Sequence, residues 1–247
     1  LRTLRFETGG ARQSVVKLGA PEHLELPYAQ VAFTGLALCR EPGRILVVGH
    51  GAGTLPMFLR RHYPAATIDS VDIDPNVVFV AREYFGFRED SRMRAHVGDG
   101  RAFIEKTRVP YDLIFLDAFG SDSVPLTLTT QEFLRAVRRA VRPDGVVVGN
   151  VWARHSNVLY DSMVRTYQEV FDDLYILTVL NTGNMILLAL PRRLNLSPAE
   201  LALRATKVSS AKRFRFDLGA SVKHGFLHAT EKNRDGHVLR DADLKQP

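Results

Sequence analysis

The chain has 247 residues, of which 45% are hydrophobic and 24% charged, and its formal net charge is +6. This composition predicts a folded domain with an ordinary core. It excludes an internal disulfide, because Cys39 is the single cysteine. It also argues against a membrane protein, because no apolar run approaches the roughly 18 residues of a membrane-spanning helix.

Cysteine usage and charge favour a cytoplasmic protein without a nucleic-acid partner. A lone cysteine fits a reducing compartment, and the opening LRTLRFETGG lacks the apolar centre of a signal peptide. The basic residues are scattered, with local clusters in RAVRRAVRP and KRFRF. Because no nucleic-acid-binding motif accompanies them, a solvated basic surface is favoured over a nucleic-acid site.

The sequence pattern of residues 1–40 predicts a small N-terminal region that differs from the rest of the chain. LRFETGG at 4–10 and RQSVVKLG at 12–19 predict a short hairpin with Gly9 and Gly10 in its turn. PYAQVAFTGLAL at 27–38 predicts a helix that leads into the next region.

Residues 41–192 predict a Rossmann-like domain, because strand-like and helix-like segments alternate along them. The apolar, strand-like runs lie at 44–49, 67–74, 93–99, 111–118 and 145–151. Nearly continuous apolar strands of this kind are typical of a parallel sheet with helices on both faces. A helix and two strands joined by LNTGN follow, at 159–171, 173–179 and 184–191. The predicted fold is α/β: a methyltransferase-like Rossmann sheet, mostly parallel with an antiparallel last strand, beside the small N-terminal β-hairpin region.

Residues 193–247 predict a C-terminal extension of helix and loop. Ser197 is the expected N-cap of a helix whose first residue is Pro198, and the later EKNRDG is polar and loop-like. The histidines of the chain show no spacing typical of metal ligands, so no metal site is expected.

A glycine-rich loop follows the first strand of the predicted sheet. VVGHGAGTLP places Gly49, Gly51 and Gly53 just before a helix. Ligands of such folds bind at this edge, where glycines let the backbone approach them closely. A tight strand-to-helix turn would need the same residues, so both interpretations stand for the loop alone.

The second strand ends in VDIDP, which places Asp72 and Ile73 at the same edge. An acid in this position can accept hydrogen bonds from both hydroxyls of a ribose. Asp74 is the competing candidate, but with Pro75 next it is better placed to cap the following helix.

The third strand ends in HVGDGR, with Asp99 and Gly100. Asp99 could accept from the amino group of an adenine beside the Gly100 amide, and it could also cap the helix GRAFIEK; the two roles are compatible. Glycines, an acid for ribose and an acid for adenine at three successive strand ends together indicate an adenosine-bearing ligand.

The fourth strand and its loop, LIFLDAFGSDSVP, carry Asp117 and Asp122. Carboxylates at this edge face the ligand crevice, where one could deprotonate an amine and the other hold a positive charge. Asp122 also fits a turn. Asp117 continues a buried strand, where an acid without a role or a partner would be costly.

These motifs together resemble the spermidine/spermine synthase (polyamine aminopropyltransferase) family, and most closely its divergent bacterial spermidine synthase-like branch. RQSVVKLG and LELPYAQ extend the resemblance upstream, so that it covers about residues 5 to 190. It implies transfer of an aminopropyl group from decarboxylated S-adenosylmethionine to a small-molecule amine, with no tightly bound cofactor. It also allows a homodimer formed through the N-terminal strands.

The resemblance implies a role for each candidate residue. Asp117, Asp122 and Tyr28 form the expected catalytic set, with Asp117 assisting the incoming amine. Asp72 would bind ribose and Asp99 adenine. The full set expected at the nucleoside is Gln13, Gly49, Gly51, Gly53, Asp72, Ile73, Asp99 and Gly100.

Three departures from the family pattern remove or move acids. The family's glycine loop usually has an aspartate, which helps bind the donor's ammonium, where this chain has Ala52. Glu25 matches one acid near Tyr28, but Gln30 stands where a second glutamate is usual. Phe119-Gly120-Ser121 precede Asp122, where the family has a short run with Asp-Pro. Loss of acids weakens a site for cations.

Three functions therefore compete. The first is an aminopropyltransferase-like enzyme with altered substrates. The second is a methyltransferase that uses intact S-adenosylmethionine, whose carboxylate Ala52 would not repel. The third is a catalytically weak nucleoside-binding or interaction protein, against which the retained Asp117 argues.

Overall fold

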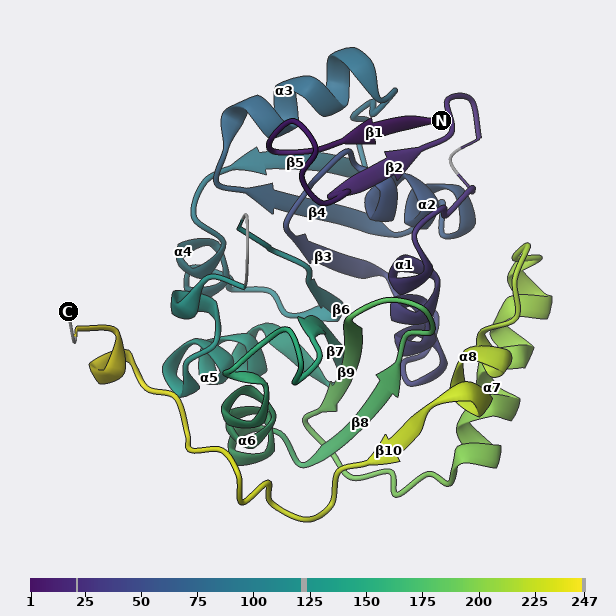
Figure 1. Ribbon diagram of the computed structural model, residues 1–247. Helices are drawn as coiled ribbons and strands as arrows, with labels where there is room; N and C mark the ends of the chain where they lie inside the picture. Colours follow the sequence, from purple (N-terminus) through teal and green to yellow (C-terminus); the bar gives the residue numbers. More distant parts are fainter. Residues whose placement is uncertain (21, 121–123, 246–247) are drawn as a thin grey trace.

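An eight-stranded sheet forms the centre of the protein, in the order β10-β8-β9-β7-β6-β3-β4-β5 (Figure 1). The structure is a computed structural model that describes residues 1–20, 22–120 and 124–245. The strands are β3 Arg44–Val48, β4 Thr67–Asp72, β5 Met93–Val97, β6 Tyr111–Leu116, β7 Val141–Trp152, β8 Asp173–Thr178, β9 Asn184–Leu190 and β10 Phe226–His228.

The pairing of the strands confirms the predicted α/β class. β5, β4, β3, β6 and β7 run parallel, and β9 lies antiparallel between β7 and β8. Residues of the parallel strands meet in register, with Val48 opposite Val71 on one side and Leu116 on the other. As a result, the loops after β3, β4 and β6 leave the sheet at one edge.

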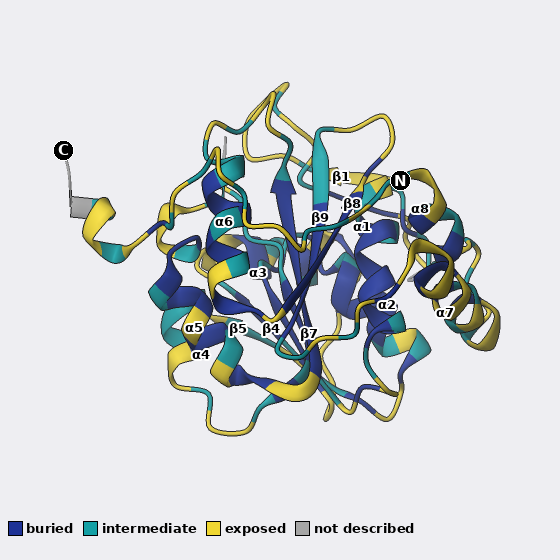
Figure 2. Ribbon diagram, turned by 90° about the horizontal axis from the view of Figure 1, so that it is seen from below, coloured by how far each residue is buried: buried dark blue, intermediate teal, exposed yellow. Residues whose placement is uncertain are grey.

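Helices cover both faces of the sheet, whose strands are buried between them (Figure 2). Side chains from α1, α2, α7 and α8 pack with one face, and side chains from α4, α5 and α6 pack with the other. The helices are α1 Pro27–Ala32, α2 Thr54–His62, α3 Pro75–Tyr84, α4 Gly100–Glu105, α5 Gln131–Ala140, α6 Tyr160–Val170, α7 Pro198–Lys212 and α8 Leu218–His224.

Local sequence explains where these helices begin and which side they bury. Thr130 caps α5 by accepting a hydrogen bond from the Phe133 amide, and Phe133 and Val137 are fully buried one turn apart. Ser197 is the N-cap of α7 and Pro198 its first residue, as predicted, and Ser197 also forms a capping box with Glu200. Apolar periodicity and capping residues thus place both helices.

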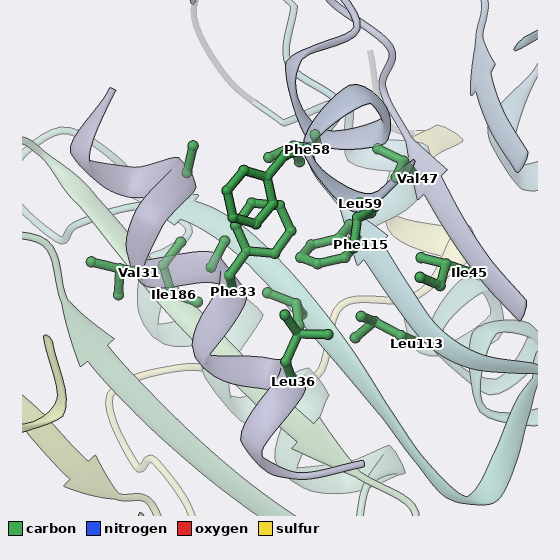
Figure 3. Packing of buried hydrophobic residues seen from close by; sticks show 14 of the residues in the cluster. Val31, Phe33, Leu36, Ile45, Val47, Phe58, Leu59, Leu113, Phe115 and Ile186 are labelled. Carbon is green, nitrogen blue, oxygen red and sulfur yellow. The ribbon is translucent and has the colours of Figure 1, made fainter. Parts of the chain in front are cut away.

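Aromatic rings fill the core between α1, α2 and the sheet (Figure 3). Phe33 stacks on Phe58 with ring centroids 4.4 Å apart, and Phe115 of β6 meets Phe33 edge-on at 5.4 Å. Such pairs add to the stabilisation from burial alone. They hold α1 and α2 against the strand that ends next to Asp117.

The predicted N-terminal hairpin is present, but its strands are shorter and its loop is longer. β1 Arg2–Leu4 pairs with β2 Ser14–Val16, and Gly9 has the positive φ of a turn residue. The helix predicted over 27–38 ends at Ala32 and continues as a 3₁₀ helix over Phe33–Ala37. Both differences lie at element ends, where periodicity gives the weakest signal.

The C-terminal extension contains more regular structure than the sequence predicted. The sequence predicted helix and loop but no strand in this region, and β10 pairs antiparallel with β8 at the edge of the central sheet. From β10 the chain runs along the outside of α6 and past α5 to its end (Figure 1). Across the described parts of the chain, no helix is both long and apolar enough to cross a membrane.

Candidate active site

A cavity of about 670 Å³ opens at the edge where β3, β4, β5, β6 and β7 end. The predicted residues that line it are Gln13, Tyr28, Gly49, Gly51, Asp72, Ile73, Asp99, Gly100 and Asp117. Gly53 is not among the lining residues, and Asp122 lies outside the described part of the chain. The residues from Gly49 to Asp117 thus meet here because the strands that carry them are parallel, and Gln13 and Tyr28 join them from the segment before β2 and from α1.

The glycine loop is shaped by contacts that exclude a side chain. Gly49 has φ +94°, and a Cβ there would lie 2.3 Å from the carbonyl oxygen of Asp117. Gly53, with φ +78°, is the N-cap of α2, where a Cβ would lie 2.8 Å from the Phe87 ring. Gly49 therefore lets the ends of β3 and β6 touch, and Gly53 serves the start of α2.

The hydrogen bonds of Asp72 and Asp74 show that these two acids have different roles. Asp72 accepts from the His50 amide at 2.9 Å and from the Asp74 amide at 3.1 Å, which fixes its carboxylate between the loop and the cavity. Asp74 accepts from the Asn76 amide at 2.8 Å and caps α3. The predicted capping role of Asp74 is confirmed, and Asp72 is the acid held against the glycine loop.

Asp99 has the capping role that the sequence allowed. It accepts from the Ala102 amide at 2.7 Å at the start of α4 and also lines the cavity. Its neighbour Gly100 lies against the end of β3, where a Cβ would come within 2.6 Å of Val48. The Asp99–Gly100 pair is therefore packed directly beside the glycine-loop strand.

Asp117 lies on the cavity wall with two neutral hydrogen-bond donors. Tyr28 donates its hydroxyl to one carboxylate oxygen at 3.1 Å, and the Asn150 amide donates to the other at 2.8 Å. Burial raises the pKa of Asp117 to about 7, although both hydrogen bonds favour the charged form. Burial and the nearby Asp117 also raise the pKa of Tyr28 well above its usual range. Tyr28 therefore acts as a neutral donor.

The sequence interpretation missed the polar residues that support Asp117. The Asn184 side chain of β9 donates to the Asn150 oxygen at 3.0 Å, so a chain of amides extends from the carboxylate along the cavity wall. Asn150 stands in the apolar run GVVVGNV. A polar residue inside a buried strand was the signal that could have found it.

Two aromatic side chains also border the cavity close to Asp117. The rings of Phe119 and Trp152 stack with centroids 5.8 Å apart. Each stands two residues beyond a member of the polar group, Asp117 or Asn150. The acid thus faces a space with an apolar wall, where water competes less for its hydrogen bonds.

At two positions where the resembling family has acids, this chain packs neutral side chains instead. Ala52 is fully buried and does not line the cavity. Gln30 donates to the Leu24 carbonyl at 2.8 Å and supports the turn before α1. Both positions contribute to packing of the scaffold.

The sheet order and the position of the cavity define a methyltransferase-like Rossmann protein. A family model described as the spermine/spermidine synthase domain matches residues 28–182. The chain belongs to this family.

Individual relatives carry two different kinds of name. The chain is 34% identical over 173 residues to a polyamine aminopropyltransferase from Vibrio vulnificus, across 68% of this chain and 57% of that protein. It is 35% identical over 172 residues to the human eEF1A lysine and N-terminal methyltransferase, across 62% of this chain but only 24% of that protein. It therefore spans between a quarter and about three fifths of these relatives.

Among solved structures, human methyltransferase-like protein 13 in complex with SAH superposes with a TM-score of 0.69 at 31% identity. The match covers 76% of this chain and 93% of that one. Family and neighbours together support a transferase that binds a nucleoside of the S-adenosylmethionine type.

Proposed function

We propose that the protein transfers an alkyl group from the sulfonium of an S-adenosylmethionine-type nucleoside to an amine, with Asp117 as the base. The observation that carries this proposal is the half-buried carboxylate of Asp117, which lines the cavity and accepts hydrogen bonds from the neutral donors Tyr28 and Asn150. A base with a pKa near the working pH is the most effective in proton transfer, and burial brings the pKa of Asp117 to about 7.

The nucleoside is held by the strand ends in this proposal. Asp72 accepts from the ribose hydroxyls, and Asp99 accepts from the adenine amino group, with Ile73 and Gly100 beside the nucleoside. Gly49 and Gly51 let the loop backbone approach it, and Gln13 reaches it from the segment before β2. These roles agree with the lining of the cavity but rest on the resemblance to the family.

The proposed reaction needs no metal and no redox partner. The acceptor ammonium gives one proton to Asp117, and the freed lone pair on nitrogen attacks the carbon beside the sulfonium. The new N–C bond forms as the C–S bond breaks, and the bonding pair stays on sulfur, which becomes a neutral thioether. The second product is the alkylated amine, and the proton on Asp117 leaves to solvent.

The family membership favours an aminopropyl group as the transferred group, with decarboxylated S-adenosylmethionine as donor and methylthioadenosine as product. A small-molecule diamine is the expected acceptor. The Vibrio vulnificus relative, named a polyamine aminopropyltransferase, supports this version.

Ala52 favours a second candidate, methyl transfer from intact S-adenosylmethionine. The acid usual in the family at this position would bind an ammonium and repel a carboxylate, and the neutral Ala52 does neither. The human relative named a lysine and N-terminal methyltransferase and the neighbour solved with SAH support this version. The acceptor would again be an amine.

The by-product distinguishes the two candidates. The protein is incubated with each donor and a mixture of diamines and lysine-containing peptides, and the nucleoside product is identified by mass spectrometry. Methylthioadenosine from the decarboxylated donor would establish aminopropyl transfer, and S-adenosylhomocysteine would establish methyl transfer. Binding of nucleoside without either product would reject catalysis and leave a nucleoside-binding protein.

A further inference from the structure

Arg12 is the one arginine or lysine among the described residues that line the cavity. Arg12, Gln13 and Ser14 line it from the segment that enters β2, and Thr54 and Leu55 line it from the start of α2. The acids that line the cavity follow β4, β5 and β6 instead. We call the Arg12–Ser14 and Thr54–Leu55 end the donor end.

Contacts between β2 and the glycine loop fix the position of the donor end. The Ser14 hydroxyl lies 3.3 Å from the Thr54 hydroxyl, and it would lie 3.0 Å from a Cβ at Gly51. Arg12 stands two residues before Ser14 and lines the same cavity. Arg12 therefore stands two residues from a contact with the loop that contains Ala52.

The Arg12 side chain is exposed, and within residues 1–20, 22–120 and 124–245 it makes no hydrogen bond or ion pair. The Ser14 and Thr54 hydroxyls, which line the same cavity, are donors as well as acceptors. The start of α2, where Gly53 provides no side-chain cap, adds to the positive potential.

We infer that the donor end recognises a carboxylate, so that the donor nucleoside keeps its amino-acid group. This inference rests on the function proposed above and concerns the part of the nucleoside beyond the sulfur. The ammonium is common to intact and decarboxylated S-adenosylmethionine, so the carboxylate decides between them. A guanidinium attracts that carboxylate in a charge-assisted hydrogen bond and repels a tail that carries only an ammonium.

The consequence is a preference for intact S-adenosylmethionine. Two features favour a carboxylate over a lone ammonium: the acid usual in the resembling family is absent at Ala52, and Arg12 lines the cavity. Of the two reactions considered above, methyl transfer is the one that uses this donor.

The test is calorimetric titration with intact S-adenosylmethionine, its decarboxylated form and methylthioadenosine, which has neither charge. Wild-type protein is compared with Arg12→Gln, Arg12→Glu and Arg12→Lys. Arg139→Gln is the matched control, because Arg139 is exposed on α5 and does not line the cavity.

Wild type should bind the intact donor at least about tenfold more tightly than the decarboxylated one. Arg12→Gln should lower this preference for the intact donor by about tenfold, Arg12→Glu should reverse the preference, and Arg12→Lys should keep part of it. Methylthioadenosine should bind all variants equally, and the control should match wild type.

The two possible failures are distinguishable. If methylthioadenosine and both donors fail to bind wild type, the proposed function is wrong. If methylthioadenosine binds but the ratio between the two donors is the same in wild type and every Arg12 variant, the carboxylate site is wrong and the proposed function stands.

Discussion

Asp117 combines two properties that rarely occur together in a residue whose role is only structural. Its carboxylate is half-buried on the cavity wall, and its hydrogen-bond donors, Tyr28 and Asn150, are both neutral. A structural acid in such a place normally has a cationic partner, because an isolated buried charge is costly. The side chain is thus held ready to take a proton from a ligand in the cavity.

Replacement of Asp117 by Asn should separate binding from catalysis. The shape and most of the neighbours are kept, so the affinity for methylthioadenosine should stay within about twofold, whereas turnover should fall by about 10²- to 10⁴-fold because the base is lost. Initial rates and calorimetry measure the two effects. Asp144→Asn, on an exposed part of β7, is the control, and unchanged turnover in Asp117→Asn would remove Asp117 from the reaction.

The same residue should make stability depend on pH. Burial raises the pKa of Asp117 from 3.8 to about 7 in the folded protein. Between about pH 4 and 7 the folded state therefore holds a proton that the unfolded chain has released. The contribution of Asp117 to stability is full below pH 4 and is lost as the pH rises to 7.

Urea denaturation of wild type and Asp117→Asn at pH 5, 6, 7 and 8 measures this loss. The difference isolates Asp117, because the other ionisable groups are common to both proteins. The free energy of unfolding of the variant should rise relative to wild type from pH 5 to 7 and then level off. A difference that does not change with pH would show that Asp117 titrates normally.

At the scale of elements, the sequence predicted the long strands of the sheet but not the short edge strand β10. Continuous apolar runs identified the strands from β3 to β9, because a strand buried on both faces tolerates few polar residues. β10 has only three residues, and its position depends on pairing with β8 and on contact of His228 with Asp173. Such long-range contacts leave no periodic signal.

In the candidate site, too, local features could be predicted from the sequence and long-range contacts could not. Acids at strand ends could be predicted because the edge of a parallel sheet has a known orientation. The chain Asp117–Asn150–Asn184 could not, because it depends on β9 lying antiparallel beside β7. The lack of an acid at Ala52 was readable in the sequence, but its complete burial needed the structure.

Gly49 tests how tightly the loop and strand ends are coupled. Gly49→Ala should lower the free energy of unfolding by more than about 1 kcal/mol and weaken nucleoside binding, because φ +94° is unfavourable for alanine and its Cβ would overlap the Asp117 carbonyl. Gly98→Ala is the matched control. Its Cβ would meet nothing within 4 Å, so its effect should stay within about 0.5 kcal/mol.

Denaturant titration measures the stability of both glycine variants, and calorimetry measures their nucleoside binding. Equal stability of Gly49→Ala and Gly98→Ala would mean that the ends of β3 and β6 can separate without cost. The description of a fixed cavity edge would then be wrong.

At the scale of the whole molecule, the C-terminal segment ties the outer helices to the edge of the cavity. After β10 it accepts hydrogen bonds from Gln168 of α6, and the buried Leu239 lies between α5 and α6. Arg101 of α4 then makes a bidentate ion pair with Asp241, 140 residues away in the sequence. Arg101 directly follows Asp99 and Gly100, so this pair connects the end of the chain to the proposed adenine site.

Arg101→Gln should therefore lower the free energy of unfolding more than the loss of an ordinary exposed ion pair does. Arg60→Gln is the control, because Arg60 is similarly exposed but pairs with Asp90, outside the C-terminal segment. The first variant should lose on the order of 1 kcal/mol and the second a few tenths, since a bidentate pair to the C-terminal segment restrains more of the chain than a single exposed ion pair. Limited proteolysis should cut residues 229–245 faster only in Arg101→Gln, and methylthioadenosine should bind this variant more weakly. If both variants were cut at the same rate, the segment would be held by its other contacts, such as those of Gln168 and Leu239, and Arg101 would have no part in coupling it to the cavity.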